Sequence, residues 1–211
     1  MITGAAGERL DRIRRERGLL TPAELMELAD RGVVVLDPFS VIVSRHVRLH
    51  PGNVLYPGAV IECDERSGCL VRPGNVLHGG TRIAATGGGT IVIGERSVIG
   101  EGGAQIKAAG PDSVEIGDET RLANGAEVMG SSRIGSGAQV LGPVSARSVT
   151  LAAGRPASHP DPDTRGGVLK GFGRAQGIRV GVGEVVNGNG DFRDAPVERQ
   201  RAYHPDAPRL A

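Results

Sequence analysis

Aromatic residues and cysteines are scarce in this sequence, and tryptophan is absent. The 211 residues include three Phe, two Tyr and two Cys. A β-sandwich or a dinucleotide-binding domain normally uses more aromatic bulk, and a disulfide framework needs more cysteines. Cys63 and Cys69 share one loop that offers too few further ligands for a metal site, so we expect no metal. The two cysteines are then either a redox pair or two reduced thiols.

An excess of charge and a long apolar run are also absent. The chain has 25 Lys and Arg against 24 Asp and Glu, a net charge of +1. This balance gives no electrostatic reason to expect nucleic acid or an anionic membrane as a partner. No apolar run approaches the roughly 18 residues of a membrane span, and the N-terminal residues lack the apolar stretch of a signal peptide. We therefore expect a soluble, cytoplasmic protein without a membrane partner.

Glycine and branched aliphatic residues are abundant instead. The chain contains 34 Gly, and Ile, Leu and Val together number 50. Too many aliphatic residues are present for a disordered chain, and the glycines show no collagen period. This combination favours a repeat architecture, in which each unit buries its apolar side chains against its neighbours.

The repeat is a hexad. An aliphatic residue recurs every six positions, and a small residue follows it four positions later. The clearest run is Ile116, Leu122, Val128, Ile134, Val140. The same pattern extends backward through Leu49, Leu55, Ile61, Val71, Leu77, Ile83, Ile93, Ile99, Ile106 and forward to Ala146. A period of six fits a short strand and a tight corner, repeated three times in a triangular coil. The aliphatic residue points into the prism, and Gly or Asn occupies corners with positive φ.

Three of these coils are longer than 18 residues. Their first residues are separated by 22, 22, 23 and 18 positions. The additional residues fall at 62–69, 85–90 and 109–113, each time after the third hexad. We expect the three segments to leave the same edge of the prism and to form a wall beside a ligand groove.

The hexads divide the chain into three parts. Residues 1–32 are predicted to be a helical segment, with Thr21-Pro22-Ala23-Glu24 as a capping box that starts a helix over the first coil. Residues 33–152 are the repeat. Residues 153–211 form a C-terminal extension that is largely irregular, with two strands within 168–186 that would make a β-hairpin. The predicted fold is therefore all-β: a parallel β-helix of about five to six coils with a short helical cap.

The hexads resemble the left-handed β-helix of the hexapeptide-repeat transferases. The segment LVRPGNVLHGGTRI (70–83) is similar to a coil in the acetyltransferase half of the bifunctional glucosamine-1-phosphate acetyltransferase/N-acetylglucosamine-1-phosphate uridyltransferase. The uridyltransferase half of that family has no counterpart here. The resemblance implies a left-handed helix, a homotrimer with ligand sites between subunits, and acetyl-CoA or another acyl-CoA as co-substrate.

The same resemblance identifies Arg72 as a residue that holds substrate phosphate. It also reveals a departure from the family. The stretch LANGAEVMG (122–130) aligns with the coil that carries the family's catalytic histidine and a tyrosine. In this alignment Gly125 stands at the histidine position and Val128 at the tyrosine position. The usual general base is then missing.

Positions that follow the inward aliphatic residues stack in columns on the outer surface, about 5 Å apart from coil to coil. Two pairs are predicted to be in contact, His50 with Arg72 and Tyr56 with His78, and His50 and Tyr56 are candidates for substrate binding. His78 is the preferred general base, because an imidazole can take a proton from an amine or hydroxyl that attacks a thioester. The alternative is a solvated surface histidine. Arg72 either clamps a phosphate or carboxylate or forms a surface ion pair with Glu62 or Asp64.

Four further residues are candidates for binding. Lys107 would contact an anionic ligand, or be solvated. Asn124 would hydrogen-bond substrate, or form a corner. Lys170 and Arg174, in a glycine-rich stretch, would touch the phosphates of coenzyme A, or only solubilise a turn.

Two functions of different classes follow. The first is an acyl-CoA-dependent acyltransferase, with acetyl the expected acyl group, acting on an amino sugar, a sugar phosphate or another small amine. The second is a non-catalytic β-helix protein that binds a small metabolite or organises partners. Gly125 favours the second, whereas Arg72, His78 and Lys107 favour the first.

Overall fold

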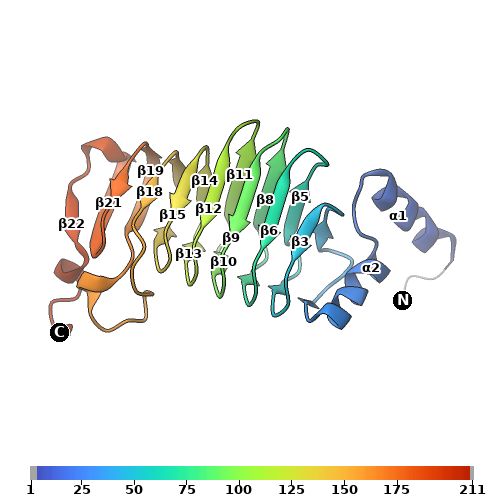
Figure 1. Ribbon diagram of the computed structural model, residues 1–211, viewed down its shortest axis with the longest axis horizontal. Coiled ribbons are helices and arrows are strands. Elements are labelled where there is room, and N and C mark those ends of the chain that lie inside the picture. The colour runs from blue at the N-terminus through green and yellow to red at the C-terminus, as the bar shows by residue number, and fades with distance from the viewer. Residues whose placement is uncertain (1–3, 210–211) are drawn as a thin grey trace.

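The computed structural model describes residues 4–209 and shows a triangular β-solenoid with helices at its N-terminal end (Figure 1). Helices α1 (Ala5–Glu16) and α2 (Pro22–Met26) are followed by the 3₁₀-helix η1 (Glu27–Arg31). The parallel strands then wind toward the C-terminus, as Figure 1 shows. The prediction of an all-β parallel β-helix with an N-terminal helical cap is confirmed. Within the described residues, no helix has both the length and the apolar character that crossing a membrane would require.

Each coil contributes one strand to each of three faces. The first face contains β1 (Val34–Val35), β4 (Val54–Leu55), β7 (Val76–Leu77), β10 (Val98–Glu101), β13 (Arg121–Ala123), β16 (Gln139–Leu141) and the first part of β19 (Val168–Gln176). The second contains β2 (Ile42–Val43), β5 (Val60–Cys63), β8 (Thr81–Thr86), β11 (Ala104–Ala109), β14 (Ala126–Met129), β17 (Val144–Arg147) and the rest of β19. The third contains β3 (Val47–Leu49), β6 (Gly68–Val71), β9 (Thr90–Ile93), β12 (Ser113–Ile116), β15 (Ser132–Ile134), β18 (Thr150–Leu151) and β20 (Arg179–Val180).

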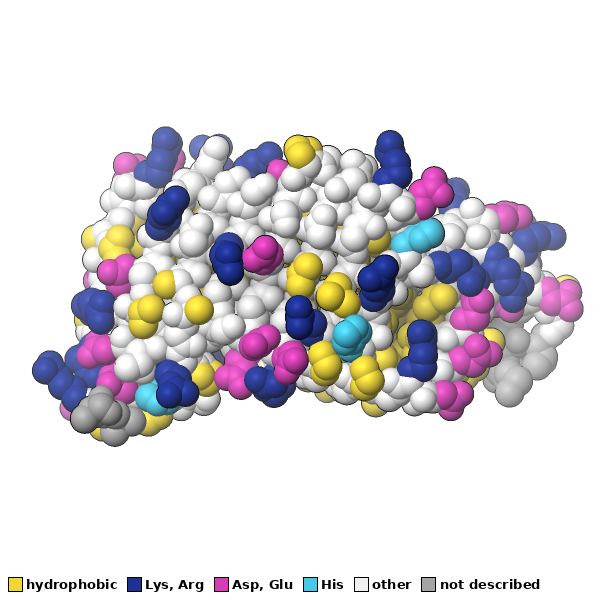
Figure 2. Space-filling model, in the orientation of Figure 1, with side chains coloured by type: hydrophobic (Ala, Val, Ile, Leu, Met, Phe, Trp, Pro, Cys, Tyr) yellow, Lys and Arg dark blue, Asp and Glu magenta, His cyan; other side chains and the backbone are white. Residues whose placement is uncertain are grey.

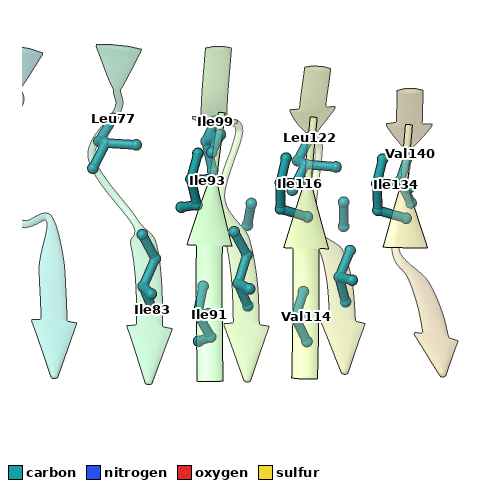
Figure 3. Packing of buried hydrophobic residues seen from close by; sticks show 14 of the residues in the cluster. Leu77, Ile83, Ile91, Ile93, Ile99, Val114, Ile116, Leu122, Ile134 and Val140 are labelled. Carbon is teal, nitrogen blue, oxygen red and sulfur yellow. The ribbon is translucent and has the colours of Figure 1, made fainter. Parts of the chain in front are cut away.

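The hexad aliphatic residues form the core. Ile116, Leu122, Val128, Ile134 and Val140 are all at most 2 % exposed, as the prism model predicts. Figure 3 shows Ile116, Leu122, Ile134 and Val140 pointing inward in ranks, with Ile83, Ile93 and Ile99 in the neighbouring coils. Of the fifteen hexad positions only Leu49, in the first coil, is half-buried rather than buried. The six-residue period therefore places one aliphatic side chain on each inner face of each coil.

A buried polar ladder fixes one corner of the prism. The Asn53 side-chain oxygen accepts from the Asn75 amide at 2.9 Å, and the Asn75 oxygen accepts from the Ser97 amide at 2.8 Å. The Ser97 hydroxyl in turn accepts from the Thr120 amide at 3.1 Å. These side chains are at most 1 % exposed. Each one satisfies a backbone group that the corner removes from the strand ladder, so the coils stack in a single register.

The longer coils widen at one edge, as predicted. Their additional residues lengthen β8 and β11 and form short turns between the second and third faces. The turns hold one another: the Asp64 carboxylate accepts from the Gly87 amide at 2.6 Å, and the Ser67 hydroxyl accepts from the Gly88 amide at 2.9 Å. Beside the first turn lies a hollow of about 330 Å³ that His46 and Arg48 help to line.

The N-terminal end has the predicted capping box. The Thr21 hydroxyl accepts from the Glu24 amide at 3.3 Å, and the Glu24 carboxylate accepts from the Thr21 amide at 2.7 Å. Gly32 ends η1 in the left-handed region with φ of 74°. The buried Arg14 of α1 donates to three carbonyl oxygens, including that of Phe39 at 2.8 Å, and so attaches α1 to the segment before β2.

The C-terminal end differs from the predicted extension. The coils continue beyond residue 152, and β19 pairs in parallel with β21 (Glu184–Asp191), so the expected hairpin is wrong. The reason is visible in a missed pattern: Leu169 and Ala175 are six residues apart and both buried, as are Val186 and Phe192. The chain passes from the first face to the second within β19 through glycines, and a Cβ at Gly171 would collide with the backbone of the next strand.

The last coil is covered by the C-terminal tail. Strand β22 (Val197–Arg199) pairs antiparallel with β21 and closes its open edge. Short 3₁₀-helices complete this end: η2 (Pro162–Thr164), η3 (Phe192–Asp194) and η4 (Gln200–Tyr203). Arg201 fastens the tail to the proline-rich loop with bonds to Asp161 at 2.6 Å and Asp163 at 2.5 Å.

Candidate functional site

An open groove of about 530 Å³ runs along the third face and the corner that follows it. Its floor contains a column of glycines at the positions after the inward aliphatic residues. A Cβ at Gly94, Gly117 or Gly135 would collide with the backbone of the next coil. Close stacking of the coils therefore explains these glycines, and their lack of side chains leaves a shallow channel parallel to the solenoid axis.

Arg72 lies at the N-terminal end of this groove, and Glu115 and Arg133 line it further along. Arg72 is exposed, and neither ion pair considered from the sequence is formed. Glu62 pairs with Arg82 at 2.6 Å, and the Asp64 carboxylate is held by its own turn. Within residues 4–209 the Arg72 guanidinium forms no hydrogen bond or ion pair, so its predicted contact with His50 includes neither. Its charge is therefore available to an anion.

His78 lies at a different edge, the corner between the first and second faces. It follows β7 directly, and Tyr56 follows β4 one coil earlier. The two rings lie with centroids 4.7 Å apart and planes inclined by 34°. The contact predicted from column stacking is therefore formed. The phenol and the imidazole are the large polar side chains of this corner.

Glu101 joins this corner from the next coil, and the column analysis missed it. The Glu101 carboxylate accepts from the Arg121 guanidinium at 2.5 Å. This bond and the charge of Arg121 lower the pKa of Glu101, and the charge of His78 acts in the same direction. The sequence does indicate an irregularity here, because Ile99 and Ile106 are separated by seven residues instead of six. The extra residue shifts the pairing of β10 between Ile99 and Glu101 and turns the carboxylate outward.

The stretch 122–130, which aligns with the coil that carries the family's catalytic histidine, places corner residues at the aligned histidine position. Asn124 and Gly125 both have positive φ, 58° and 86°. The Asn124 side-chain oxygen occupies the space where a Cβ on Gly102 would lie. Val128, at the family's tyrosine position, is fully buried in the prism. Neither aligned position presents a side chain that could act as an acid or a base.

The other predicted binding residues are dispersed. Lys107 lies on the second face and pairs with Glu127 at 3.1 Å. Lys170 lies in the part of β19 that extends the first face, where it pairs with Leu141 of β16. Arg174 lies in the part of β19 that extends the second face, where it pairs with Ser145 of β17. The Lys170 ammonium lies 3.3 Å from the centroid of the Tyr203 ring. The structure therefore brings Tyr56 and His78 together but does not unite Lys170 with Arg174.

No group of three or more His, Cys, Asp or Glu side chains within residues 4–209 is arranged to hold a metal. Cys63 and Cys69 are free thiols buried on adjoining strands, 4 % and 3 % exposed. Burial, and secondarily the neighbouring Cys63, raises the pKa of Cys69 to about 12. Burial also raises the pKa of Cys63, with a contribution from Asp64. At neutral pH both sulfurs therefore carry their protons.

No family model matches the chain, and no curated protein matches it. Among solved structures, the chain is similar to the crystal structure of the polySia specific acetyltransferase NeuO, with a TM-score of 0.47 and 17% sequence identity. The alignment covers 80% of this chain and 82% of that one. At this level of similarity the comparison concerns the fold alone.

Proposed function

We propose that this protein is an acyl-CoA-dependent acyltransferase whose general base is His78. The observation that carries the proposal is the outward cluster of Tyr56, His78 and Glu101 at one corner of a hexapeptide-type solenoid. The imidazole lies against a tyrosine ring, and the carboxylate of the next coil interacts with it electrostatically. An outward imidazole in such a cluster can accept a proton from an attacking amine or hydroxyl.

The chemistry follows from these groups. The acceptor's amine or hydroxyl attacks the thioester carbonyl while His78 takes the proton from the attacking atom. The carbon–sulfur bond then breaks, and the proton passes from the imidazolium to the leaving thiolate. Backbone amides of the glycine-rich corners would stabilise the oxyanion between these steps. Glu101, held by Arg121, would stabilise the imidazolium without taking the proton.

The arrangement also alters the proposed use of Arg72. Arg72 follows β6 at the corner before the first face, whereas His78 follows β7 at the corner after it, so one copy of the chain does not place both against one small acceptor. In a homotrimer, the groove of one subunit would adjoin the His78 corner of another. Apolar side chains exposed on the first face support such packing: Val34 at 47 %, Leu36 at 52 % and Tyr56 at 37 %. Figure 2 shows one face of the molecule, on which histidine, basic and hydrophobic side chains lie together over the coils nearest the N-terminal helices.

The second candidate is a non-catalytic β-helix protein that binds a metabolite or organises partners. The observation that favours it is the corner at Asn124 and Gly125, which holds no base where the family resemblance places one. The two proposals differ in a simple property. A scaffold would release no coenzyme A thiol, whereas the acyltransferase would.

The test is thiol release from acetyl-CoA, with glucosamine 1-phosphate and glucosamine as probe acceptors. Wild-type protein should release thiol only when an acceptor is present. His78→Ala should lower turnover by roughly 10² to 10⁴. His204→Ala, in the exposed C-terminal tail, is the matched control and should retain full turnover. Acetyl-CoA and acceptor that neither bind nor react would favour the scaffold. Equal turnover of His78→Ala and wild type would exclude His78 as the base.

A further inference from the structure

A second cavity, of about 240 Å³, lies where the last coils meet the C-terminal tail. Neither the His78 corner nor the Arg72 groove contributes to it. Its apolar wall is formed by Leu141, Val168 and Val185 together with the Tyr203 ring. Its polar lining residues are Gln139, Gln200, Arg165, Lys170 and His204. The lining includes three side chains that carry or can accept positive charge and no carboxylate.

Lys170 is the distinctive residue of this cavity. The chain has only two lysines, and the other, Lys107, is neutralised by Glu127. Among the described residues Lys170 forms no ion pair, and its ammonium lies over the Tyr203 ring instead. Burial lowers the pKa of Lys170, against the opposing charge of Glu198. The Glu198 carboxylate is engaged by the Tyr203 hydroxyl, so it does not neutralise the ammonium directly.

The remaining polar groups are positioned by bonds outside the cavity. The Arg165 Nε donates to the His159 carbonyl at 2.7 Å, and no hydrogen bond to its terminal nitrogens is recorded among residues 4–209. The Gln200 amide donates to the Gly166 carbonyl at 2.7 Å and to the Glu184 carbonyl at 3.1 Å. These bonds hold the polar side chains of the wall in place. The Lys170 ammonium and the terminal nitrogens of Arg165 can still donate hydrogen bonds to a ligand. A carboxylate or phosphate oxygen is the partner that such groups accept best.

We propose that this cavity binds a small organic anion, with one carboxylate or phosphate directed at Lys170 and Arg165 and an apolar body against Leu141, Val168 and Tyr203. The volume limits the size of the ligand, because pockets for drug-sized molecules are about 300–1,000 Å³. This binding site does not depend on the proposed acyl transfer, and either proposal can be wrong without affecting the other. Gln139 and His204 would complete the polar contacts.

The two lysines make a direct experiment feasible. Protein labelled with ¹³C at the lysine ε-carbons should give one signal for Lys170 and one for Lys107. The probes are benzoate, which has both a charge and an apolar body, benzamide, which has the body without the charge, and inorganic phosphate, which has the charge alone. Benzoate should shift the Lys170 signal saturably and raise the pKa of that amine, while Lys107 stays unchanged as the internal control.

Two variants sharpen the result. Arg165→Gln should weaken benzoate binding at least fivefold, whereas Arg147→Gln on the second face should leave it unaffected; thermal unfolding verifies that both variants fold. Calorimetry on Lys170→Met should show the same loss of binding, because methionine keeps the apolar stem but not the charge. Equal shifts with benzamide, equal shifts at both lysines, or no saturable shift at all would overturn the proposal. If inorganic phosphate bound as strongly as benzoate, the proposed contact of an apolar ligand body with the cavity wall would be wrong.

Discussion

The corner of His78 and the groove of Arg72 arise from the same hexads yet differ in character. Arg72 and His78 are six residues apart, and this spacing places them at two successive corners, Arg72 after β6 and His78 after β7. The groove is floored by glycines that the stacking of coils requires, whereas the corner carries large polar side chains from successive coils. In a solenoid, a site is therefore built from residues about one coil apart in sequence. Residues one hexad apart lie on different edges.

The largest expected effect comes from a core substitution that unfolds the coils and thereby removes both sites. Leu122→Asp places a carboxylate in the fully buried prism, where no partner can compensate its desolvation. We expect a loss of several kcal/mol in the free energy of unfolding and collapse of the coils on both sides. Thermal unfolding followed by circular dichroism measures it. Gln105→Asp, on the exposed side of β11, is the control and should unfold like wild type. A folded, fully stable Leu122→Asp protein would contradict the prism.

The next prediction distinguishes the two sites by their separate effects on kcat and KM. His78→Ala should lower kcat by roughly 10² to 10⁴, because it removes the proton acceptor. Arg72→Ala should raise KM for a phosphorylated ligand and leave kcat nearly unchanged, because the guanidinium positions an anion and moves no proton. Steady-state kinetics on both variants distinguishes these outcomes. A fall in kcat for Arg72→Ala as large as that for His78→Ala would show that the groove and the corner act in one chemical step.

A smaller effect tests the residue that sequence reasoning missed. Glu101→Gln keeps the shape of the side chain but removes the charge beside His78. We expect kcat to fall roughly tenfold, with little change in KM. Glu127→Gln, which removes the ion pair of Lys107 on the second face, is the matched control and should have no such effect. Equal kcat in Glu101→Gln and wild type would assign Glu101 a purely structural role.

The smallest effect concerns acid and the N-terminal cap. Burial alone would raise the pKa of Glu24, but the Thr21 amide and Arg45 outweigh it and lower the pKa from 4.5 to about 2. A carboxyl whose folded pKa is depressed stabilises the fold above its unfolded value and loses that contribution as pH falls toward the folded value. Between pH 4.5 and 2 we expect the amides of β1 and β4 to lose protection relative to their intrinsic exchange rates at each pH, while those of β12 and β15 stay protected.

The Glu24→Gln variant provides the control for this prediction. It cannot titrate at position 24, so its cap should be weaker at neutral pH and show less change with acid. Hydrogen exchange at several pH values measures both proteins. Uniform loss of protection along the whole solenoid would contradict a local cap effect.

The sequence predicted the fold well and the site only in part, for physical reasons. An inward aliphatic residue every six positions is a strong local signal, so the core and the Tyr56–His78 contact followed from stacking alone. Glu101 was missed because an inserted residue shifts the register, and column counting assumes none. The last coils were missed because the proline-rich segment 155–164 interrupts the hexads, which resume only with Leu169, Ala175, Val186 and Phe192.

Rescue of the His78→Ala variant by added imidazole tests the central claim most directly. If His78 is the base, free imidazole should enter the vacated corner and restore part of the thiol release from acetyl-CoA, in proportion to its unprotonated fraction. Arg72→Ala should show no such rescue, because its defect lies in binding an anion. Turnover of His78→Ala that matches wild type, or that stays low and does not respond to imidazole, would contradict the assignment of the base to this corner.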